Sequence, residues 1–282
     1  EHDRVVSAAA EGLEVMVSTD HNYIMDYSPF VMSEGLQDFV TSVVGVEMSS
    51  LEMGHFNAFP LTYDAGWSSH FPFVSTCYEP NAAKVNESAF DWVECSPKQI
   101  FSNLRELGAY GPSKTIVQVN HPRDSILGYF DQYYVNPYTG IPEENPSGDN
   151  YGSLVSLGIR SNSPSGQFEA ESFSADFDAV EVFNGKRLDT LFSFPMPERD
   201  KFPSGWTEDM IDAFIAEKQD ACEGGHIENG PGRLILEKGG HVSNPGVIND
   251  WMNLINTGAR PTATGNSDSH SLEEELGSPR NY

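Results

Sequence analysis

Histidine, carboxylate and asparagine side chains follow each of several short apolar runs in this chain. They occupy positions 20–22, 47, 120–123, 184 and 266–270. Imidazole and carboxylate ligands without a thiolate suit Zn, Mn or Fe. In an extended segment, Asp268 and His270 face the same side and can both address one metal cluster. A carboxylate can bridge two cations, and paired metals generate hydroxide, so these residue types indicate metal-dependent hydrolysis.

The elements that must position these residues are strands and helices that alternate along the chain. Short β-rich runs are expected at 14–18, 43–47, 115–119, 179–183 and 262–265. Helical patterns are expected at 3–11, 96–107, 207–215 and 244–258. Ser96 and Thr207 are expected to cap the second and third helices, and the fourth is expected to bury Val247, Ile248, Trp251 and Ile255. This alternation predicts an α/β fold with a largely parallel sheet or a barrel. Active sites of such folds lie at the carboxyl ends of the strands, where the polar residues occur.

A single domain is expected over residues 1–282, with a long loop insertion at about 124–176. The insertion is rich in Tyr, Asn, Pro, Gly and Ser, and its aromatic residues either wall the pocket or pack locally. The helix expected at 3–11 has no strand before it, and the chain does not begin with Met. We therefore expect the first strand of the sheet to be missing from this sequence.

Acidic residues greatly exceed basic ones, with 42 Asp and Glu against 16 Lys and Arg and a net charge of -26. This charge excludes binding to nucleic acid or to an anionic membrane through a basic face. No run approaches the roughly 20 apolar residues that span a bilayer. Cys77, Cys95 and Cys222 are far apart and indicate neither a disulfide framework nor a zinc-thiolate site. The compartment stays open between cytoplasmic and periplasmic or secreted, and so does the oligomeric state.

The order of the polar motifs resembles that of a known superfamily. The motifs are Ser18 to Asn22, Gly45 to Glu47, Gly54 to Asn57, Asn120 to Arg123 and Gly265 to His270. Together they resemble the PHP (polymerase and histidinol phosphatase) superfamily, and within it the metallohydrolase branch that includes carbamate-insecticide hydrolases. The resemblance extends over nearly the whole chain. It implies a distorted seven-stranded β/α barrel that holds two or three divalent metals.

The resemblance also implies which residues bind the first two metals. Glu47 would bridge the two, His55 and His121 would bind the second, and Asp268 would bind the first. The superfamily completes the first metal site with a His-x-His motif on its first strand. That motif is absent here, and its place lies upstream of Glu1. The first site is therefore expected to be weak or empty in this chain, whereas the second is intact.

The remaining implied roles concern a third metal and the reaction itself. His21 and His270 would bind the third metal. Asp20 would orient a ligand or move a proton, and its alternative is a turn or cap residue. Arg123 would hold an anionic or carbonyl oxygen of the substrate, and its alternative is a structural salt bridge.

Glu181 and Asn184 match a stretch that lines the pocket in the superfamily, with strand-end packing as the alternative. The expected activity is hydrolysis of a small-molecule ester, with a phosphomonoester or phosphodiester as the first choice. A carbamate or carboxylic ester on the same site is the alternative, because the acidic surface repels phosphate esters at low salt. A non-catalytic metal-binding or scaffold domain is the alternative of another class.

Overall fold

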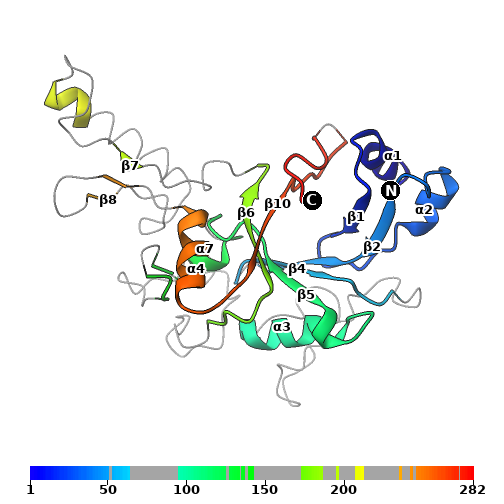
Figure 1. The fold of residues 1–282 in the computed structure, drawn as a ribbon, viewed down its shortest axis with the longest axis horizontal. Coiled ribbons are helices and arrows are strands. Elements are labelled where there is room, and N and C mark those ends of the chain that lie inside the picture. Colours follow the sequence, from blue (N-terminus) through cyan, green and yellow to red (C-terminus); the bar gives the residue numbers. More distant parts are fainter. Residues whose placement is uncertain are drawn as a thin grey trace, which may run out of the picture.

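The computed structural model describes residues 1–50, 53–63, 95–124, 127–133, 135–136, 139–142, 173–186, 195–196, 207–212, 235–236, 242–243, 246–272 and 274–282. It is a mixed α/β structure, as the alternation of elements predicted (Figure 1). Within these residues, no helix has the length and apolar character needed to cross a membrane.

The central sheet carries most of the residues that the sequence singled out. Its strand order is β10-β6-β5-β4-β3. The strands are β3 (Val46–Ser49), β4 (His55–Phe59), β5 (Ile116–Val119), β6 (Ala179–Asn184) and β10 (Thr262–Asn266). The pairs β10–β6 and β5–β6 are parallel, whereas β4 is antiparallel to both of its neighbours. The sheet is therefore mixed and not largely parallel, because β4 runs antiparallel to both neighbours. The sequence pattern did not predict β4.

The other strands of the described residues form two smaller sheets. β1 (Val15–Ser18) and β2 (Thr41–Val44) form a parallel pair. The short strands β7 (Pro195–Met196), β8 (Ile235–Leu236) and β9 (Val242–Ser243) form the other sheet.

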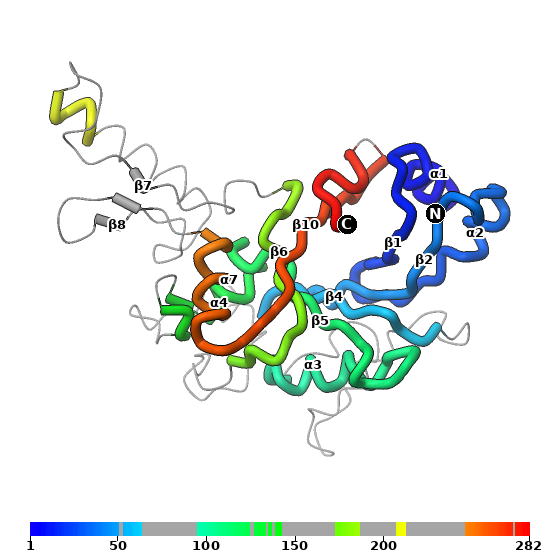
Figure 2. The backbone as a smooth tube through the Cα atoms, viewed as in Figure 1, coloured from blue at the N-terminus to red at the C-terminus, as the bar shows by residue number. Residues whose placement is uncertain are grey.

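Among the described residues, the strands do not close into a barrel. β1 pairs with β2 alone and β10 with β6 alone, so each of these strands has a free edge. Figure 2 shows the segment after β10, drawn in red, reaching from β10 towards α1 (His2–Ala10). The Arg280 Nη1 donates to the Glu11 carbonyl there at 2.8 Å. The α/β class is thus confirmed in an open form.

Gly45 joins β2 to β3 and so connects the first pair of strands to the central sheet. A Cβ atom at Gly45 would lie 2.8 Å from the Ser18 carbonyl oxygen and 3.0 Å from the Ala58 carbonyl oxygen. The close approach of these backbones therefore requires glycine. It brings His21, just after β1, into a parallel bridge with Glu47 on β3.

The helices follow from local signals at their ends. α3 (Pro97–Glu106) begins with Pro97 and a capping box, in which the Gln99 side chain accepts from the Ser96 N–H at 2.8 Å. Residues 208–212 are helical after Thr207, whose hydroxyl accepts from the Met210 N–H at 3.3 Å. Both cap predictions are confirmed.

α7 (Val247–Asn256) differs from its prediction at both its start and its buried face. It begins after Gly246, later than the expected start at 244. Leu254 is buried, whereas Ile255, which the pattern placed on the buried face, is exposed. The remaining helices, α2 (Ser28–Ser33), η2 (Pro112–Lys114) and α4 (Tyr129–Gln132), were not expected.

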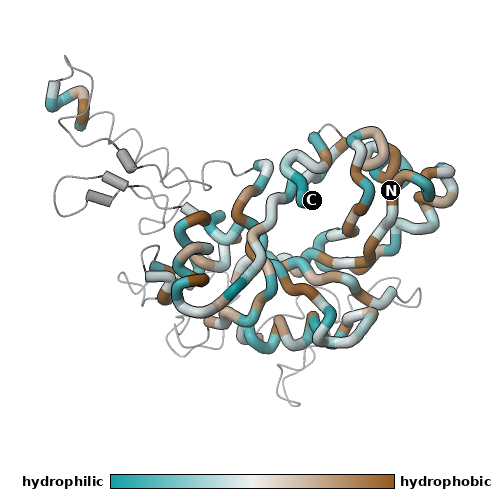
Figure 3. The backbone as a smooth tube through the Cα atoms, viewed as in Figure 1, coloured by the Kyte–Doolittle hydropathy of each residue, from teal (hydrophilic) through white to brown (hydrophobic). Residues whose placement is uncertain are grey.

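The aromatic residues of the insertion pack in the main core. Tyr129 and Phe130 are fully buried. Tyr129 contacts Phe101 of α3 and Phe56 of β4, and Phe130 contacts Phe177 just before β6. Tyr129 and Phe130 do not line the pocket, and their contacts extend beyond their own loop into the main core, so neither alternative describes them. Tyr134 lies outside them. A second core joins α1, α2 and β1, and Figure 3 shows the hydrophobic residues along β1 and β5.

Cys95, at the beginning of the segment that contains α3, is disulfide-bonded. The cysteine spacing gave no indication of a disulfide, so that expectation was wrong for this residue. Widely separated cysteines meet only through the fold, which spacing does not encode.

Gly54 fixes the start of β4 and therefore the place of His55. Its φ is +95°, and a Cβ atom would lie 2.6 Å from the Tyr129 backbone nitrogen. We expect Gly54→Ala to destabilise the protein more than Gly35→Ala, which meets no atom and adds only the strain of a φ of +70°. That strain costs about 1–2 kcal/mol. Urea unfolding of both variants measures the difference, and equal losses would contradict the role of the close contact.

Candidate metal centre

One carboxylate oxygen lies at the centre of the site. Glu47 on β3 is 6% exposed. Its Oε1 lies 2.8 Å from His55 Nδ1, 3.8 Å from His21 Nδ1 and 3.9 Å from His121 Nε2. His21 follows β1, His55 begins β4 and His121 follows β5. Three separate strands therefore direct an imidazole towards the same oxygen.

This arrangement fits a divalent metal ion. The ligand atoms of His21, Glu47 and His55 lie within 4.8 Å of one another. Nδ1 of His55 and Nδ1 of His121 are buried without a hydrogen bond. The short approach of His55 to Glu47 therefore has no hydrogen-bond geometry. Buried polar atoms without partners are rare, and a lone pair facing a carboxylate oxygen is the geometry of two ligands that share a cation.

The pKa directions of Glu47 and His55 agree with ligand chemistry, whereas that of His121 does not. Burial lowers the pKa of His121, but Glu47 and Glu181 outweigh burial and raise it. Burial raises the pKa of Glu47, but the neighbouring His121 and His55 outweigh burial and lower it well below its usual range. Burial lowers the pKa of His55, so its imidazole is neutral at neutral pH. A carboxylate and a neutral imidazole are the forms that bind metals.

A second part of the site lies at the exposed rim. His21 Nε2 is 2.9 Å from His270 Nε2, and the two side chains are 45% and 46% exposed. Asp268 Oδ1 lies 3.4 Å from His270 Nδ1. The structure therefore brings His270 to His21 and places Asp268 beside His270. Ser49, two residues after Glu47 on β3, lies 2.5 Å from His21 Nδ1 through its Oγ.

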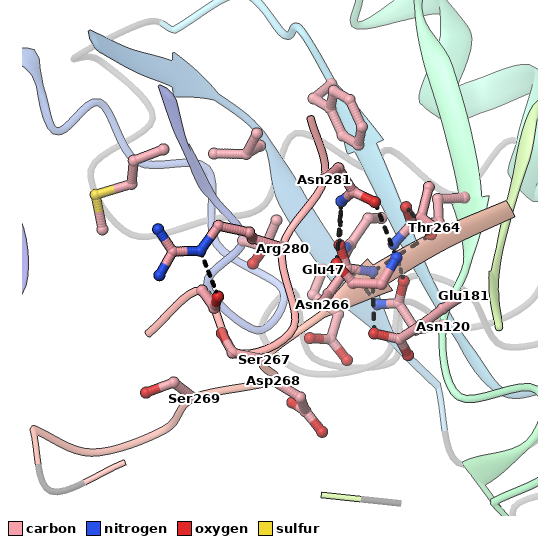
Figure 4. A pocket seen from close by; sticks show the side chains of 18 of the residues that line it. Glu47, Asn120, Glu181, Thr264, Asn266, Ser267, Asp268, Ser269, Arg280 and Asn281 are labelled. Atoms are coloured by element: carbon pink, nitrogen blue, oxygen red, sulfur yellow. Dashed lines mark hydrogen bonds between the residues drawn. The ribbon is translucent and has the colours of Figure 1, made fainter. Parts of the chain in front are cut away.

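A cavity of about 750 Å³ connects the two parts. Figure 4 shows Glu47, Glu181 and Asn266 close together, with Ser267, Asp268 and Ser269 along the segment that follows β10. The predicted site residues that line the cavity are Asp20, His21, Glu47, His121, Glu181, Asn184, Asp268 and His270. These predicted residues therefore lie around one cavity, whereas His55 reaches Glu47 without lining the cavity.

Backbone strain is concentrated at the same place. Among the described residues, the non-glycine residues with positive φ are Asn22 (54°), His121 (24°) and Asp268 (52°). Each is a predicted ligand or follows one directly. Such conformations cost about 1–3 kcal/mol each and persist where the surrounding structure holds them. The Asn22 N–H donates to the Glu47 carbonyl at 2.7 Å, which holds the loop of His21 against β3.

Glu181 holds the loop of His121 in place. It is buried on β6 and accepts from the His121 N–H at 2.6 Å, from Asn184 Nδ2 at 3.0 Å and from Asn266 Nδ2 at 3.0 Å. Asn184 also donates to Asp268 Oδ2 at 3.2 Å. Glu181 and Asn184 thus line the cavity as predicted, and they also link the His121 and Asp268 segments.

We expect Glu181→Gln to lower metal affinity about 10- to 100-fold, the usual effect of removing a partner that orients a ligand. The variant keeps the size of the side chain, but its amide nitrogen cannot accept the hydrogen bond that the His121 N–H or an asparagine makes. Metal titration by calorimetry measures the effect. The control is Asp176→Asn, which replaces an exposed carboxylate outside the cavity. Equal affinities for both variants would refute this orienting role.

Asp20 lines the cavity and is held by a tyrosine that the sequence did not indicate. The Tyr27 hydroxyl lies 3.0 Å from both oxygens of Asp20 and donates to that carboxylate. Burial, followed by the charge of Asp20, raises the pKa of Tyr27 above its usual value, so the hydroxyl keeps its proton. The geometry therefore leaves Asp20 as a carboxylate at the cavity wall, oriented by Tyr27.

Arg123 does not line the cavity. It is 3% exposed, its Nε and Nη2 donate to Asp250 at 2.8 and 2.6 Å, and its Nη1 donates to Asp131 at 3.1 Å. Nη2 also donates to the Val135 carbonyl at 2.6 Å. The substrate-binding role is therefore corrected in favour of the structural salt bridge. The motif fixed its place after β5, but its direction depends on Asp250 of the distant helix α7.

The comparisons with known proteins add no further assignment to this geometry: no family model, no curated protein and no solved structure matches the chain.

Proposed function

We propose that this protein is a metal-dependent hydrolase of ester bonds, with a phosphoester as the first choice of substrate. The observation that carries the proposal is the approach of three imidazoles to Glu47 Oε1, of which the nearest nitrogen, Nδ1 of His55, is buried without a hydrogen bond. The finer fold assignment, a PHP-type barrel, is part of the same proposal and rests on the order of the motifs.

The proposed ligand set is the one that the resemblance implies. Glu47, His55 and His121 would hold one metal, and Glu47 and Asp268 would contribute to a second. His21 and His270, whose Nε2 atoms face each other at 2.9 Å, would hold the third. The compact group in the structure, His21, Glu47 and His55, supports part of this set. Bound divalent metals supply Lewis acidity and lower the pKa of water, which provides a nucleophile at neutral pH.

The other residues of the chain position the substrate and move the proton. Asp20, oriented by Tyr27, accepts the proton of the attacking water and passes it to the leaving group. Glu181 and Asn184 keep the His121 and Asp268 segments at a fixed separation. Because Glu47 is buried, bulk water would compete little with its carboxylate for a bound metal.

A carbamate or carboxylic ester is the second candidate substrate. The cavity wall includes the apolar side chains of Leu13, Val15, Met16 and Ile116. An apolar wall favours a substrate with an uncharged organic group, which the alternative esters share.

The test combines metal analysis with a substrate screen. The purified protein is loaded with Mn, Zn or Fe, bound metal is quantified, and phosphomonoester, phosphodiester, aryl carbamate and aryl ester substrates are compared. We expect two or three metals per chain and hydrolysis that a chelator abolishes. At most one metal per chain without hydrolysis would favour the non-catalytic metal-binding domain. Hydrolysis of aryl esters without phosphatase activity would favour the second candidate.

A further inference from the structure

Arg4 of α1 contacts the segment that carries two of the proposed metal ligands. Its Nη1 donates to the Ser269 hydroxyl at 2.9 Å and to the Ser271 carbonyl at 3.3 Å. Ser269 lies between Asp268 and His270 in the sequence. The fold thus brings the first helix and the last segment of the chain together at the rim of the site.

The guanidinium of Arg4 has capacity left for a ligand. It lines the cavity and is half-buried. Its Nε and Nη2 have no hydrogen-bond partner among the described residues, and it makes no ion pair with any of them. Its charge lowers the pKa of Tyr27 against the larger effect of burial, so it lies near the Tyr27–Asp20 pair as well.

Three other arginines of the described residues are engaged elsewhere, and a fourth, Arg260, is exposed and does not line the cavity. Arg123 is buried against Asp250 and Asp131. Arg105 pairs with Asp178 at 2.7 Å. Arg280 lines the same cavity, but its Nε donates to the Gly277 carbonyl and its Nη1 to the Glu11 carbonyl, both at 2.8 Å.

We propose that Arg4 binds an anionic phosphoryl oxygen of the substrate at the Asp268–His270 end of the cavity and thereby selects anionic over neutral esters. This inference rests on the proposed hydrolase function for its substrate. A planar guanidinium with free donors matches the oxygens of a phosphoryl group, and a chain of net charge -26 needs such a local cation to hold an anion. The hydrogen bond to Ser269 fixes Nη1 of Arg4, so Nε and Nη2 remain to donate to the ligand.

Inorganic phosphate is the probe for the test, with binding measured by calorimetry in the presence and absence of Mn. We expect Arg4→Met to weaken phosphate binding about 10- to 100-fold, the range for a hydrogen bond to a charged group. Arg4→Lys keeps the positive charge but lacks the paired N–H donors of the guanidinium. Its phosphate affinity should therefore lie between those of the unaltered protein and Arg4→Met. Ser269→Ala should weaken binding less than Arg4→Met. Arg260→Met, which removes an exposed cation outside the cavity, is the matched control and should bind phosphate as the unaltered protein does.

Two substrates with the same leaving group separate this inference from the proposed function. Arg4→Met should raise KM for 4-nitrophenyl phosphate about 10- to 100-fold and leave 4-nitrophenyl acetate within about twofold. Unchanged phosphate binding in Arg4→Met, in a variant that still melts cooperatively, would overturn the role of Arg4 whether or not the protein is a hydrolase. Phosphate binding that depends on Arg4 in a protein without metal or hydrolysis would uphold this anion site and overturn the hydrolase proposal.

Discussion

Glu47→Gln is expected to reduce metal affinity more than 100-fold and to abolish hydrolysis. Removal of a group that only orients a ligand costs about 10- to 100-fold, and Glu47 is the proposed bridging ligand itself. Its Oε1 is the atom that three imidazoles approach, so an amide at this position offers a weaker, uncharged donor to each metal. The substitution keeps the volume of the side chain, so the loss is one of ligand chemistry.

The measurement is metal content after dialysis, followed by the rate of ester hydrolysis. Glu14→Gln is the matched control, because it removes one negative charge from an exposed residue just before β1, outside the cavity. It should retain full metal content. Metal content of Glu47→Gln equal to that of the control would show that Glu47 is not a ligand, whatever the activity.

The largest expected effect on stability comes from Arg123. We expect Arg123→Met to lower the free energy of unfolding by about 3–5 kcal/mol, because it leaves buried carboxylates without their cation. Asp250 is 1% exposed and Asp131 is 4% exposed. Burial raises the pKa of Asp250 although Arg123 opposes the rise, so this carboxyl depends on its partner.

Urea unfolding monitored by circular dichroism measures this loss. Combining Arg123→Met with Asp250→Leu should recover part of it, since the double variant leaves Asp131 but no longer Asp250 as a buried carboxylate without its cation. Glu34→Gln, which breaks the exposed pair with His2, is the control and should cost about 0–1 kcal/mol. A stable Arg123→Met variant with a raised KM would instead restore the substrate-binding role that the motif suggested.

Local sequence signals predicted many of the elements that position the site. Four of the five expected strands are present, and Ser96 and Thr207 cap helices as expected. The fifth, expected at 43–47, is divided at Gly45 into β2 and β3, which lie in different sheets. Strand periodicity and capping depend on residues close together in the chain, so one sequence suffices for them. β4 was missed because His55 to Phe59 is a short run that begins with a polar residue, and its antiparallel pairing depends on partners that lie elsewhere in the chain.

The sequence by itself determined the chemistry available to the protein: imidazoles and carboxylates that follow strands, and an acidic surface. Tertiary structure decided how these groups are used. It directed Arg123 into the core, set Glu181 to hold His121, brought His21 to His270, and placed Arg4 beside Ser269. The physical reason is that these contacts join residues far apart in the chain, whose meeting depends on how strands and helices pack. Residue type fixes what a side chain can bind, and packing fixes which partner it meets.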